Sequence, residues 1–227
     1  MEILLDDINL KDVKEAVEHL PLAGVTSNPT VVKKAGPKAF YEHMRTVREL
    51  IGYGRTLHIQ VTATDSESQL KEAERIFEEI DEDVYIKVPV DWEGLKTIKT
   101  LKEQGRNVTA TAVYDIMQAY AALAAGADYI AVYVNRMASV GSDPYDLIAR
   151  IEDRIARDGY DAKILAASFH SVQQVRDSLN AGAGSITSPL SVLKATYGNA
   201  NINGAVEGFH NDWETLYGKG SSLLNVK

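Results

Sequence analysis

The chain has 227 residues, of which 45% are hydrophobic and 25% charged, so it can bury a large core and has no composition typical of disorder. Its formal net charge of -8, with the acidic residues spread along the chain, argues against nucleic-acid and anionic-membrane partners, which require a basic face. Cysteine is absent, which excludes disulfides and thiolate metal sites, and no apolar run is long enough to span a bilayer.

The chain begins with MEILLDDINL (1–10), which lacks the basic and apolar regions of a signal peptide and already has the pattern of a strand. We therefore expect a cytoplasmic protein. From there, short apolar runs alternate with segments of helical periodicity. The runs that predict strands are ILL (3–5), AGVT (23–26), LHIQV (57–61), VYIKV (84–88), NVTATAV (107–113), YIAVYV (129–134), KILAAS (163–168) and SIT (185–187).

Amphipathic helices are predicted between these runs. The clearest are LKDVKEAVEHL (10–20) and SQLKEAERIFEEI (68–80), which place their apolar residues on one stripe. GLKTIKTLKEQG (94–105) ends in a glycine suited to a left-handed cap, and DPYDLIARIEDRIARDG (143–159) begins with Asp-Pro and ends in glycine. One more amphipathic segment, residues 201–218, follows the last strand.

Eight predicted strands that alternate with helices indicate an α/β fold. We expect a closed (β/α)8 TIM barrel, formed by residues 1–227 as a single domain. The alternative is an open doubly wound sheet, which is less favoured because no glycine-rich phosphate motif follows the first strand. The segment 201–218 is an additional C-terminal helix, and we expect it to pack on a neighbouring subunit.

Polar side chains lie near the ends of nearly all the predicted strands. In a TIM barrel these ends meet at one rim, where active sites occur. A single polar strand end is unremarkable, but their joint convergence predicts a functional site. The residues concerned are Asp6, Thr26, Ser27, Asn28, Gln60, Lys87, Thr109, Thr111, Tyr133, Asn135, Arg136, Ser168, Thr187 and Ser188.

Lys87 stands out because it lies within the apolar run DVYIKVPV (83–90). If Val84, Ile86 and Val88 face the helices, Lys87 points into the barrel. Burial disfavours a charged ammonium group and lowers its pKa, and a neutral amine forms a Schiff base with a carbonyl. The alternative is a structural lysine paired with a carboxylate, for which Asp6 is the obvious partner. The two interpretations do not exclude each other.

Other strand ends have comparable alternatives. Asp6 either binds a substrate hydroxyl or relays a proton, or it caps a helix or forms a salt bridge. Asn28, before Pro29, either reaches the substrate or serves turn chemistry alone. Arg136 and Ser168 suit a phosphate, with a surface ion pair as the alternative for the arginine.

Tyr133 and Gln60 suit a catalytic water, with satisfied polar core groups as the alternative. His58 shares a strand face with Gln60 and is more typical of a packed residue than of a ligand. The five histidines show no metal spacing, so we expect no metal site. Tyr114 is interpreted as a core or helix-face residue.

Five motifs together carry a family resemblance: AGVTSNPT (23–30), IKVPV (86–90), TAVY (111–114), YVNR (133–136) and LAASF (165–169). In this order they closely resemble the small transaldolase family, and most of all its fructose-6-phosphate aldolase branch. The resemblance covers nearly the whole chain. It implies a TIM barrel whose Schiff-base lysine is Lys87.

The resemblance also implies roles for other residues. Asp6 would assist at the donor hydroxyls, and Thr26 and Asn28 would line the donor pocket. A water acting as acid and base would be held by a set of three residues, and a further set would bind the sugar phosphate. The water-binding set is Gln60, Thr111 and Tyr133, and the substrate-binding set is Asn135, Arg136 and Ser168.

The aldolase branch is favoured because true transaldolases typically carry Glu in place of Gln60 and Phe in place of Tyr133. The implied enzyme is a class I aldolase that cleaves fructose 6-phosphate reversibly to dihydroxyacetone and glyceraldehyde 3-phosphate without a cofactor. Two residues depart from the pattern: Ser27 stands where Thr is commoner, and Thr109 stands where well-known aldolases have an apolar residue.

Three alternatives stay open. The first is a transaldolase of the pentose phosphate pathway, the second an aldolase for another donor such as hydroxyacetone or glycolaldehyde. The third is a barrel that binds a sugar phosphate without catalysis. The resemblance further implies a homo-oligomer, a decamer of stacked pentamers, in which the segment 201–218 reaches a neighbouring subunit.

Overall fold

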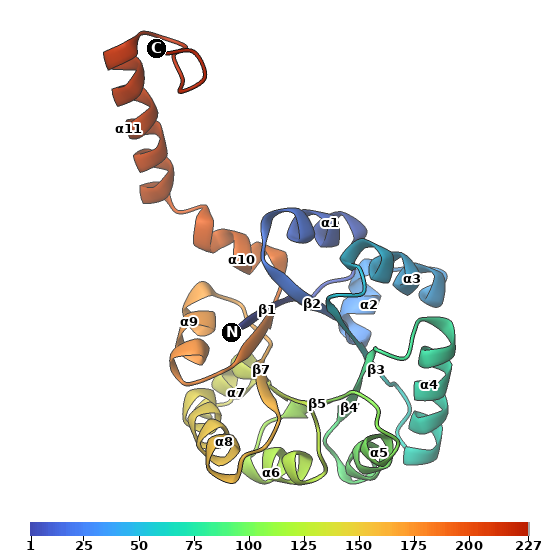
Figure 1. The fold of residues 1–227 in the computed structure, drawn as a ribbon. Helices are drawn as coiled ribbons and strands as arrows, with labels where there is room; N and C mark the ends of the chain where they lie inside the picture. The colour runs from blue at the N-terminus through green and yellow to red at the C-terminus, as the bar shows by residue number, and fades with distance from the viewer. Residues whose placement is uncertain (227) are drawn as a thin grey trace. The chain divides into compact units, whose positions relative to one another are not determined.

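The structure, a computed structural model of the chain, describes residues 1–226. Parallel strands form a closed barrel in chain order, and the helices that connect them lie around its outside (Figure 1). The predicted TIM barrel is thereby confirmed. The strands are β1 (Glu2–Leu5), β2 (Leu22–Thr26), β3 (Thr56–Gln60), β4 (Tyr85–Pro89), β5 (Val108–Val113), β6 (Tyr129–Val132), β7 (Lys163–Ala166) and β8 (Ser185–Ser188).

The helices include those predicted from periodicity, with ends shifted by one or two residues. Those predicted are α1 (Leu10–His19), α4 (Ser66–Glu79), α5 (Trp92–Glu103), α8 (Pro144–Asp158) and α11 (Ala200–Tyr217). The others are α2 (Pro29–Ala35), α3 (Phe40–Ile51), α6 (Ile116–Ala124), α7 (Val134–Ser139), α9 (Val172–Asn180) and α10 (Leu190–Tyr197).

Local sequence signals set the ends of α8. The side chain of Asp143 accepts hydrogen bonds from the backbone amides of Tyr145 and Asp146, and Pro144 occupies the first turn. Gly159 ends the helix with φ 71°, a left-handed conformation that glycine adopts without steric cost. The predicted Asp-Pro start and glycine end are confirmed.

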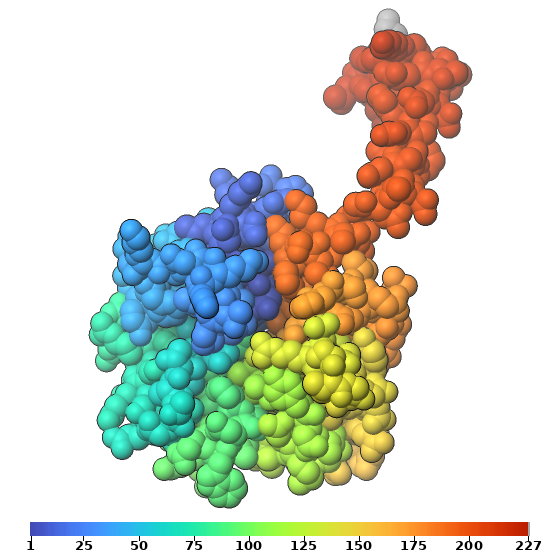
Figure 2. All heavy atoms as spheres, turned by 180° about the vertical axis from the view of Figure 1, so that it is seen from behind, coloured from blue at the N-terminus to red at the C-terminus, as the bar shows by residue number. Residues whose placement is uncertain are grey.

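The chain forms two compact units, Met1–Leu190 and a C-terminal segment that begins at Ser191. Within the first unit, segments adjacent in sequence are adjacent around the barrel, as the progression of colours in Figure 2 shows. The predicted single domain of residues 1–227 ends one residue beyond the described part, and it stays a prediction. None of the helices in the described part has the length and apolarity that crossing a bilayer requires.

The lower half of the barrel interior, toward the N-terminal ends of the strands, is a packed core. Side chains of β1, β6 and β7 meet there, and Ala23 and Tyr85 pack against them. The members of this cluster are Leu4, Tyr129, Ala131 and Leu165. Because these residues come from strands on different sides of the barrel, their contact shows that side chains fill its centre.

A polar layer belongs to the same lower half. His58 is fully buried and lies between two threonines, with Nδ1 2.8 Å from Thr109 Oγ1 and Nε2 2.9 Å from Thr56 Oγ1. Its ring stacks on Tyr85 at 4.7 Å between centroids. The Tyr129 hydroxyl donates to Glu2 Oε2 at 2.9 Å. The interpretation of His58 as a packed residue is therefore confirmed.

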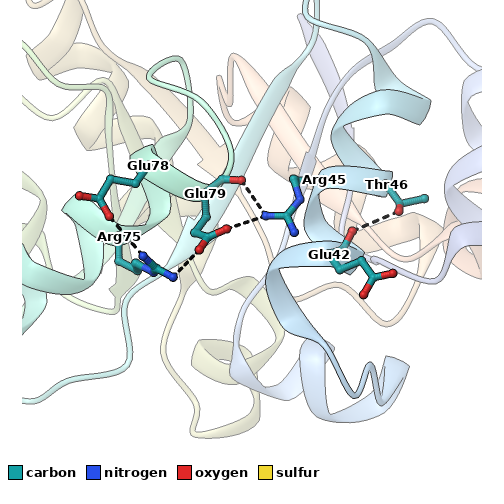
Figure 3. Close-up of polar contacts among 6 residues, drawn as sticks. All are labelled: Glu42, Arg45, Thr46, Arg75, Glu78 and Glu79. Atoms are coloured by element: carbon teal, nitrogen blue, oxygen red, sulfur yellow. Dashed lines mark hydrogen bonds and ion pairs between the residues drawn. The ribbon is translucent and has the colours of Figure 1, made fainter.

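Outside the barrel, ion pairs connect α3 and α4 (Figure 3). Arg45 Nη1 lies 2.6 Å from Glu79 Oε2, and Arg75 pairs with both Glu79 and Glu78. These side chains are partly or largely exposed, so each pair contributes at most about 1 kcal/mol to stability. They support the outer layer and lie away from the strand ends.

The backbone is irregular at two points near the C-terminal ends of the strands. The pairing of β5 with β6 shifts register between Ala110 and Val113, and Ala112 within this shift has φ 58°. Ser168, after β7, has φ 65°. These are the non-glycine residues with left-handed φ among residues 1–226, and each conformation costs about 1–2 kcal/mol.

Candidate active site

A cavity of about 160 Å³ lies at the C-terminal ends of the strands. Asp6 follows β1, Asn28 follows β2 and Lys87 belongs to β4, so the barrel brings together residues far apart in the sequence. Seven of the residues predicted at the strand ends line the cavity: Asp6, Asn28, Lys87, Tyr133, Arg136, Ser168 and Thr187. The other lining residues are Thr30, Val31, Ala167, Phe169, His170 and Pro189.

Lys87 points into the barrel, as its strand pattern predicted, and its side chain is 3% exposed. Burial lowers the pKa of its amine, and the negative charge of Asp6 opposes this by raising it. Within residues 1–226, no hydrogen bond or ion pair joins the amine to a carboxylate. The alternative of a Lys87–Asp6 salt bridge is therefore not formed, and the two groups interact through space.

Asp6 is held from one side. Its Oδ1 accepts a hydrogen bond of 2.9 Å from the Thr26 hydroxyl. Burial raises the pKa of the Asp6 carboxyl, whereas Lys87 and the bond from Thr26 act in the opposite direction. The alternative of Asp6 as a helix cap is wrong, because Asn9 caps α1.

Tyr133 and Thr111 face each other at 3.0 Å between the hydroxyl oxygens. Burial raises the pKa of the Tyr133 phenol, which is therefore protonated near neutral pH and able to donate a hydrogen bond. The predicted strand 129–134 ends earlier than expected, at Val132, because Tyr133 turns the chain into α7. This turn directs the phenol into the cavity.

Tyr114 belongs to the rim of the site, so its interpretation as a core or helix-face residue is wrong. Its side chain is 40% exposed, and its ring meets the ring of Tyr133 edge-on at 5.5 Å. Arg136 Nη1 donates to the Tyr114 hydroxyl at 3.3 Å, and the Arg136 guanidinium lies 4.8 Å from the Tyr133 ring centre. Arg136 has no ion-pair partner in residues 1–226, which removes the surface-ion-pair alternative.

Asn28 has two functions available. Its Oδ1 accepts hydrogen bonds from the backbone amides of Thr30 and Val31 and so caps α2. Its Nδ2 makes no hydrogen bond within the described residues, and the side chain lines the cavity. The turn interpretation is confirmed, and the amide hydrogens stay available for a ligand.

Four residues that were given a catalytic or substrate-binding role lie outside the cavity wall. One is Thr111, which is fully buried against the Tyr133 hydroxyl. Thr26 is fully buried behind Asp6, and Asn135 Oδ1 accepts a hydrogen bond of 2.9 Å from Gln174 Nε2. Gln60 pairs in register with Lys87 on the neighbouring strand but lines a second cavity of about 450 Å³, which it shares with Asn28. Gln60 Oε1 is buried without a hydrogen-bond partner in the described structure, so it offers an acceptor to a water or ligand.

Thr30 and His170 were not predicted to line the cavity, whereas Thr187 was among the polar strand ends but was given no role. Thr187 is the penultimate residue of β8 and has its hydroxyl on the inner side, a position that strand alternation indicates once the barrel is assumed. No group of three metal-binding side chains lies together among residues 1–226. The chemistry available at the cavity is thus that of an amine, a carboxyl group, a phenol and a guanidinium.

Comparisons with known proteins agree with this geometry. The model of the transaldolase/fructose-6-phosphate aldolase family matches residues 3–220. A relative from Streptococcus pneumoniae (strain ATCC 700669), described as a probable fructose-6-phosphate aldolase, is 44% identical over 213 residues. The match covers 94% of this chain and 96% of that protein.

Proposed function

Because the chain belongs to the transaldolase/fructose-6-phosphate aldolase family and is a transaldolase-like aldolase, we propose that it cleaves fructose 6-phosphate through a Schiff base on Lys87. The products would be dihydroxyacetone and glyceraldehyde 3-phosphate, and the reaction would be reversible. One observation supports this most: a buried lysine, with no hydrogen bond or ion pair to a carboxylate within residues 1–226, faces a cavity with Asp6 and Tyr133.

The amine starts the reaction. Its lowered pKa increases the neutral fraction, which attacks the ketose carbonyl carbon. Water leaves from the resulting carbinolamine, and a protonated iminium remains. Because the iminium accepts the electron pair of a neighbouring bond, this step needs no cofactor.

Carbon–carbon cleavage follows from a base near the C4 hydroxyl. We assign this task to a water held by Tyr133, Thr111 and Gln60, supported by the Tyr133–Thr111 contact of 3.0 Å and by the unpartnered Gln60 Oε1. The water takes the C4 hydroxyl proton and the C3–C4 bond breaks. The electron pair of that bond moves toward the iminium to form the enamine, and glyceraldehyde 3-phosphate is released. Protonation at C3 and hydrolysis of the iminium then release dihydroxyacetone and the free lysine.

The substrate phosphate is assigned to the rim. Arg136 and Ser168 line the same cavity, and the Arg136 guanidinium, which has no carboxylate partner in the described residues, is available for bidentate contact with a phosphate. Asn28 Nδ2 and Asp6 would bind the donor hydroxyls. Asn135 would act less directly, by joining α7 to α9 through Gln174.

A transaldolase is the second candidate, favoured by the family match, whose description names both activities. Gln60 and Tyr133 favour the aldolase, because a phenol and a neutral amide can hold the water that protonates and hydrolyses the enamine. Without such a water, the enamine would wait for a second sugar, as transfer in the pentose phosphate pathway requires.

The test follows glyceraldehyde 3-phosphate with a coupled dehydrogenase. The protein is incubated with fructose 6-phosphate alone and then with added erythrose 4-phosphate. Release without the acceptor supports the aldolase, and release only with it supports the transaldolase. No release in either case, together with no borohydride-trapped adduct from hydroxyacetone or glycolaldehyde, would favour a barrel that binds a sugar phosphate without catalysis.

We further propose a cytoplasmic homo-oligomer, a decamer of two pentamers, in which α11 packs on a neighbouring subunit. Support comes from α11, which has no buried residue in the described chain and exposes large apolar side chains. Phe209 is 73% exposed and Val206 60% exposed. Sedimentation of the full chain would give the subunit number.

A further inference from the structure

Two buried threonines lead from β8 to the candidate catalytic carboxyl group. Thr187 Oγ1 lies 2.7 Å from Thr26 Oγ1, and Thr26 Oγ1 lies 2.9 Å from Asp6 Oδ1. Thr26 is fully buried, and Thr187 is 1% exposed. Because β1 pairs with both β2 and β8, these side chains span three neighbouring strands on the inner side of the barrel.

The direction of both hydrogen bonds follows from counting protons. Thr26 has one hydroxyl proton and gives it to Asp6 Oδ1, so it can only accept from Thr187. Thr187 is therefore the donor to Thr26. Since Thr26 has no other proton and no exposed surface, it cannot donate to a substrate, and the pocket-lining role implied by resemblance does not fit its position.

We propose that Thr26 and Thr187 are positioning residues that keep Asp6 Oδ1 engaged and leave Oδ2 for the substrate donor hydroxyls. This inference rests on the proposed function, in which Asp6 acts on the donor. Asp6 Oδ2 makes no hydrogen bond within residues 1–226, and Asp6 lines the cavity. With Oδ1 accepting from Thr26, any proton that Asp6 carries is confined to Oδ2.

Other charged and titratable groups also face Asp6. Lys87 lies across the barrel, Asp7 follows in the chain, and Lys34 approaches from α2. Tyr133 and Arg136 interact with Asp6 from the other side of the cavity. The hydrogen bond from Thr26 lowers the Asp6 pKa, in opposition to burial, and so favours the ionised carboxylate. Its removal should raise that pKa and move the acid limb of the pH–activity profile, the range in which activity falls as the pH decreases, to higher pH.

The competing explanation is that the threonines merely satisfy one another in the core. Substitution by valine and by serine distinguishes this explanation from the proposed positioning role. Thr→Val keeps the shape and removes the hydroxyl, whereas Thr→Ser keeps the hydroxyl. The control is Thr97→Val. Thr97 is a fully buried threonine on α5 whose hydroxyl donates to Gln69 Oε1 at 2.6 Å, away from the cavity.

The experiment measures kcat/KM for fructose 6-phosphate cleavage against pH, with thermal unfolding of each variant. For Thr26→Val we expect the acid limb to move up by about one pH unit, as loss of a hydrogen bond to a charged group implies. Thr187→Val shifts the limb in the same direction by less, because it weakens the bond indirectly. Thr187→Ser restores the wild-type limb, and Thr97→Val lowers stability without moving it.

An unshifted limb in Thr26→Val would overturn the inference, as would equal limbs for Thr187→Val and Thr187→Ser. If Thr187→Val does not fold, Thr187→Ala takes its place, because alanine cannot crowd Thr26. Failure of the proposed function is recognised separately: the wild-type protein would release no glyceraldehyde 3-phosphate and trap no adduct at Lys87.

Discussion

The upper and lower halves of the barrel interior both contain buried polar groups, but they differ in how these groups are paired. In the lower half, both His58 nitrogens contact threonine hydroxyls, and Tyr129 donates to Glu2. In the upper half, the Lys87 amine lacks a hydrogen-bonded partner within residues 1–226, and Gln60 Oε1 is unpaired. Buried polarity alone therefore does not mark a functional site, and within the barrel interior it is incomplete pairing that distinguishes the upper half.

The lower layer is complete enough to determine the tautomer of its histidine. Thr56 donates to the Ala23 carbonyl at 3.4 Å, so it accepts from His58 Nε2. Thr109 then donates to Nδ1. A neutral imidazole satisfies every group here, and burial together with the charge of Lys87 holds the His58 pKa well below its ordinary value of 6.5.

The largest expected effect comes from Lys87→Met in the upper half. The variant should lose cleavage activity and the borohydride-trapped adduct altogether, because no other lysine among residues 1–226 lines this cavity. The unfolding free energy of this variant should not fall, since an apolar side chain of similar length replaces an unpaired buried amine. Mass spectrometry of the trapped protein checks this, and an adduct at another lysine would contradict the assignment.

The second-largest effect is expected for Tyr133→Phe. Cleavage of fructose 6-phosphate without an added acceptor sugar should fall by about 10²–10³-fold, within the range of a lost acid–base contribution. Transfer of the donor unit to added erythrose 4-phosphate should fall less, because transfer does not require protonation of the enamine. Equal losses in both assays would mean that Tyr133 does not control this partition. Thr111→Val serves as the matched variant, since it removes the phenol's partner and keeps the phenol.

In the lower half of the barrel, His58→Phe should lower the stability of the protein and leave its activity largely unchanged. Thr56 and Thr109 lose their shared partner, and unfolding by urea should show a loss of about 2–3 kcal/mol, as unpaired buried hydroxyls imply. Cleavage by the folded fraction should stay within a few-fold of wild type. A large loss of kcat with unchanged stability would place His58 in the chemistry and remove the contrast between the halves.

The pH dependence of stability sharpens the same contrast. His58 has a lowered pKa when folded, so below 6.5 the unfolded chain binds a proton that the folded chain does not. Stability is then fully present above that pH and falls by up to about 1.4 kcal/mol per pH unit as the pH decreases. Comparing urea midpoints of wild type and His58→Phe from pH 7 to pH 5 should show a shallower decline in the variant.

The smallest expected effect belongs to Tyr114→Phe at the rim. It removes the hydroxyl that receives the Arg136 hydrogen bond and keeps the ring against Tyr133. We expect KM for fructose 6-phosphate to rise about three- to fivefold, the range of one exposed hydrogen bond, with kcat nearly constant. Cleavage of an unphosphorylated ketose should not change, and a parallel rise in its KM would show that Tyr114 does not act through the phosphate.

The sequence predicted the barrel and the inward direction of Lys87, because alternation along a strand determines which face a residue occupies. It also predicted Asp6 and Tyr133 at the cavity. Pairings between side chains of different strands have no such periodic signal. Thr26 was therefore misjudged, because its proton goes to Asp6 rather than to a substrate.

Tyr114 was misjudged for a related reason. Its place depends on the last residues of β5, where a register shift and the left-handed Ala112 redirect the chain just before Tyr114, and no local motif specifies that geometry. Gln60 was expected in the wall of the same cavity as Lys87. The structure places it in register with Lys87 but on the wall of the adjoining cavity.

The two left-handed residues, Ala112 and Ser168, bear on how this chain would respond to selection for heat tolerance. Glycine at either position would relieve about 1–2 kcal/mol of backbone strain. The side chain of Ala112 is only a methyl group, so Ala112→Gly would gain stability without the loss of a functional group. Ser168 lines the cavity, and Ser168→Gly would gain the same relief but remove the hydroxyl that we assign to the substrate phosphate. Heat-tolerant lineages should therefore acquire glycine at position 112 and retain serine at 168.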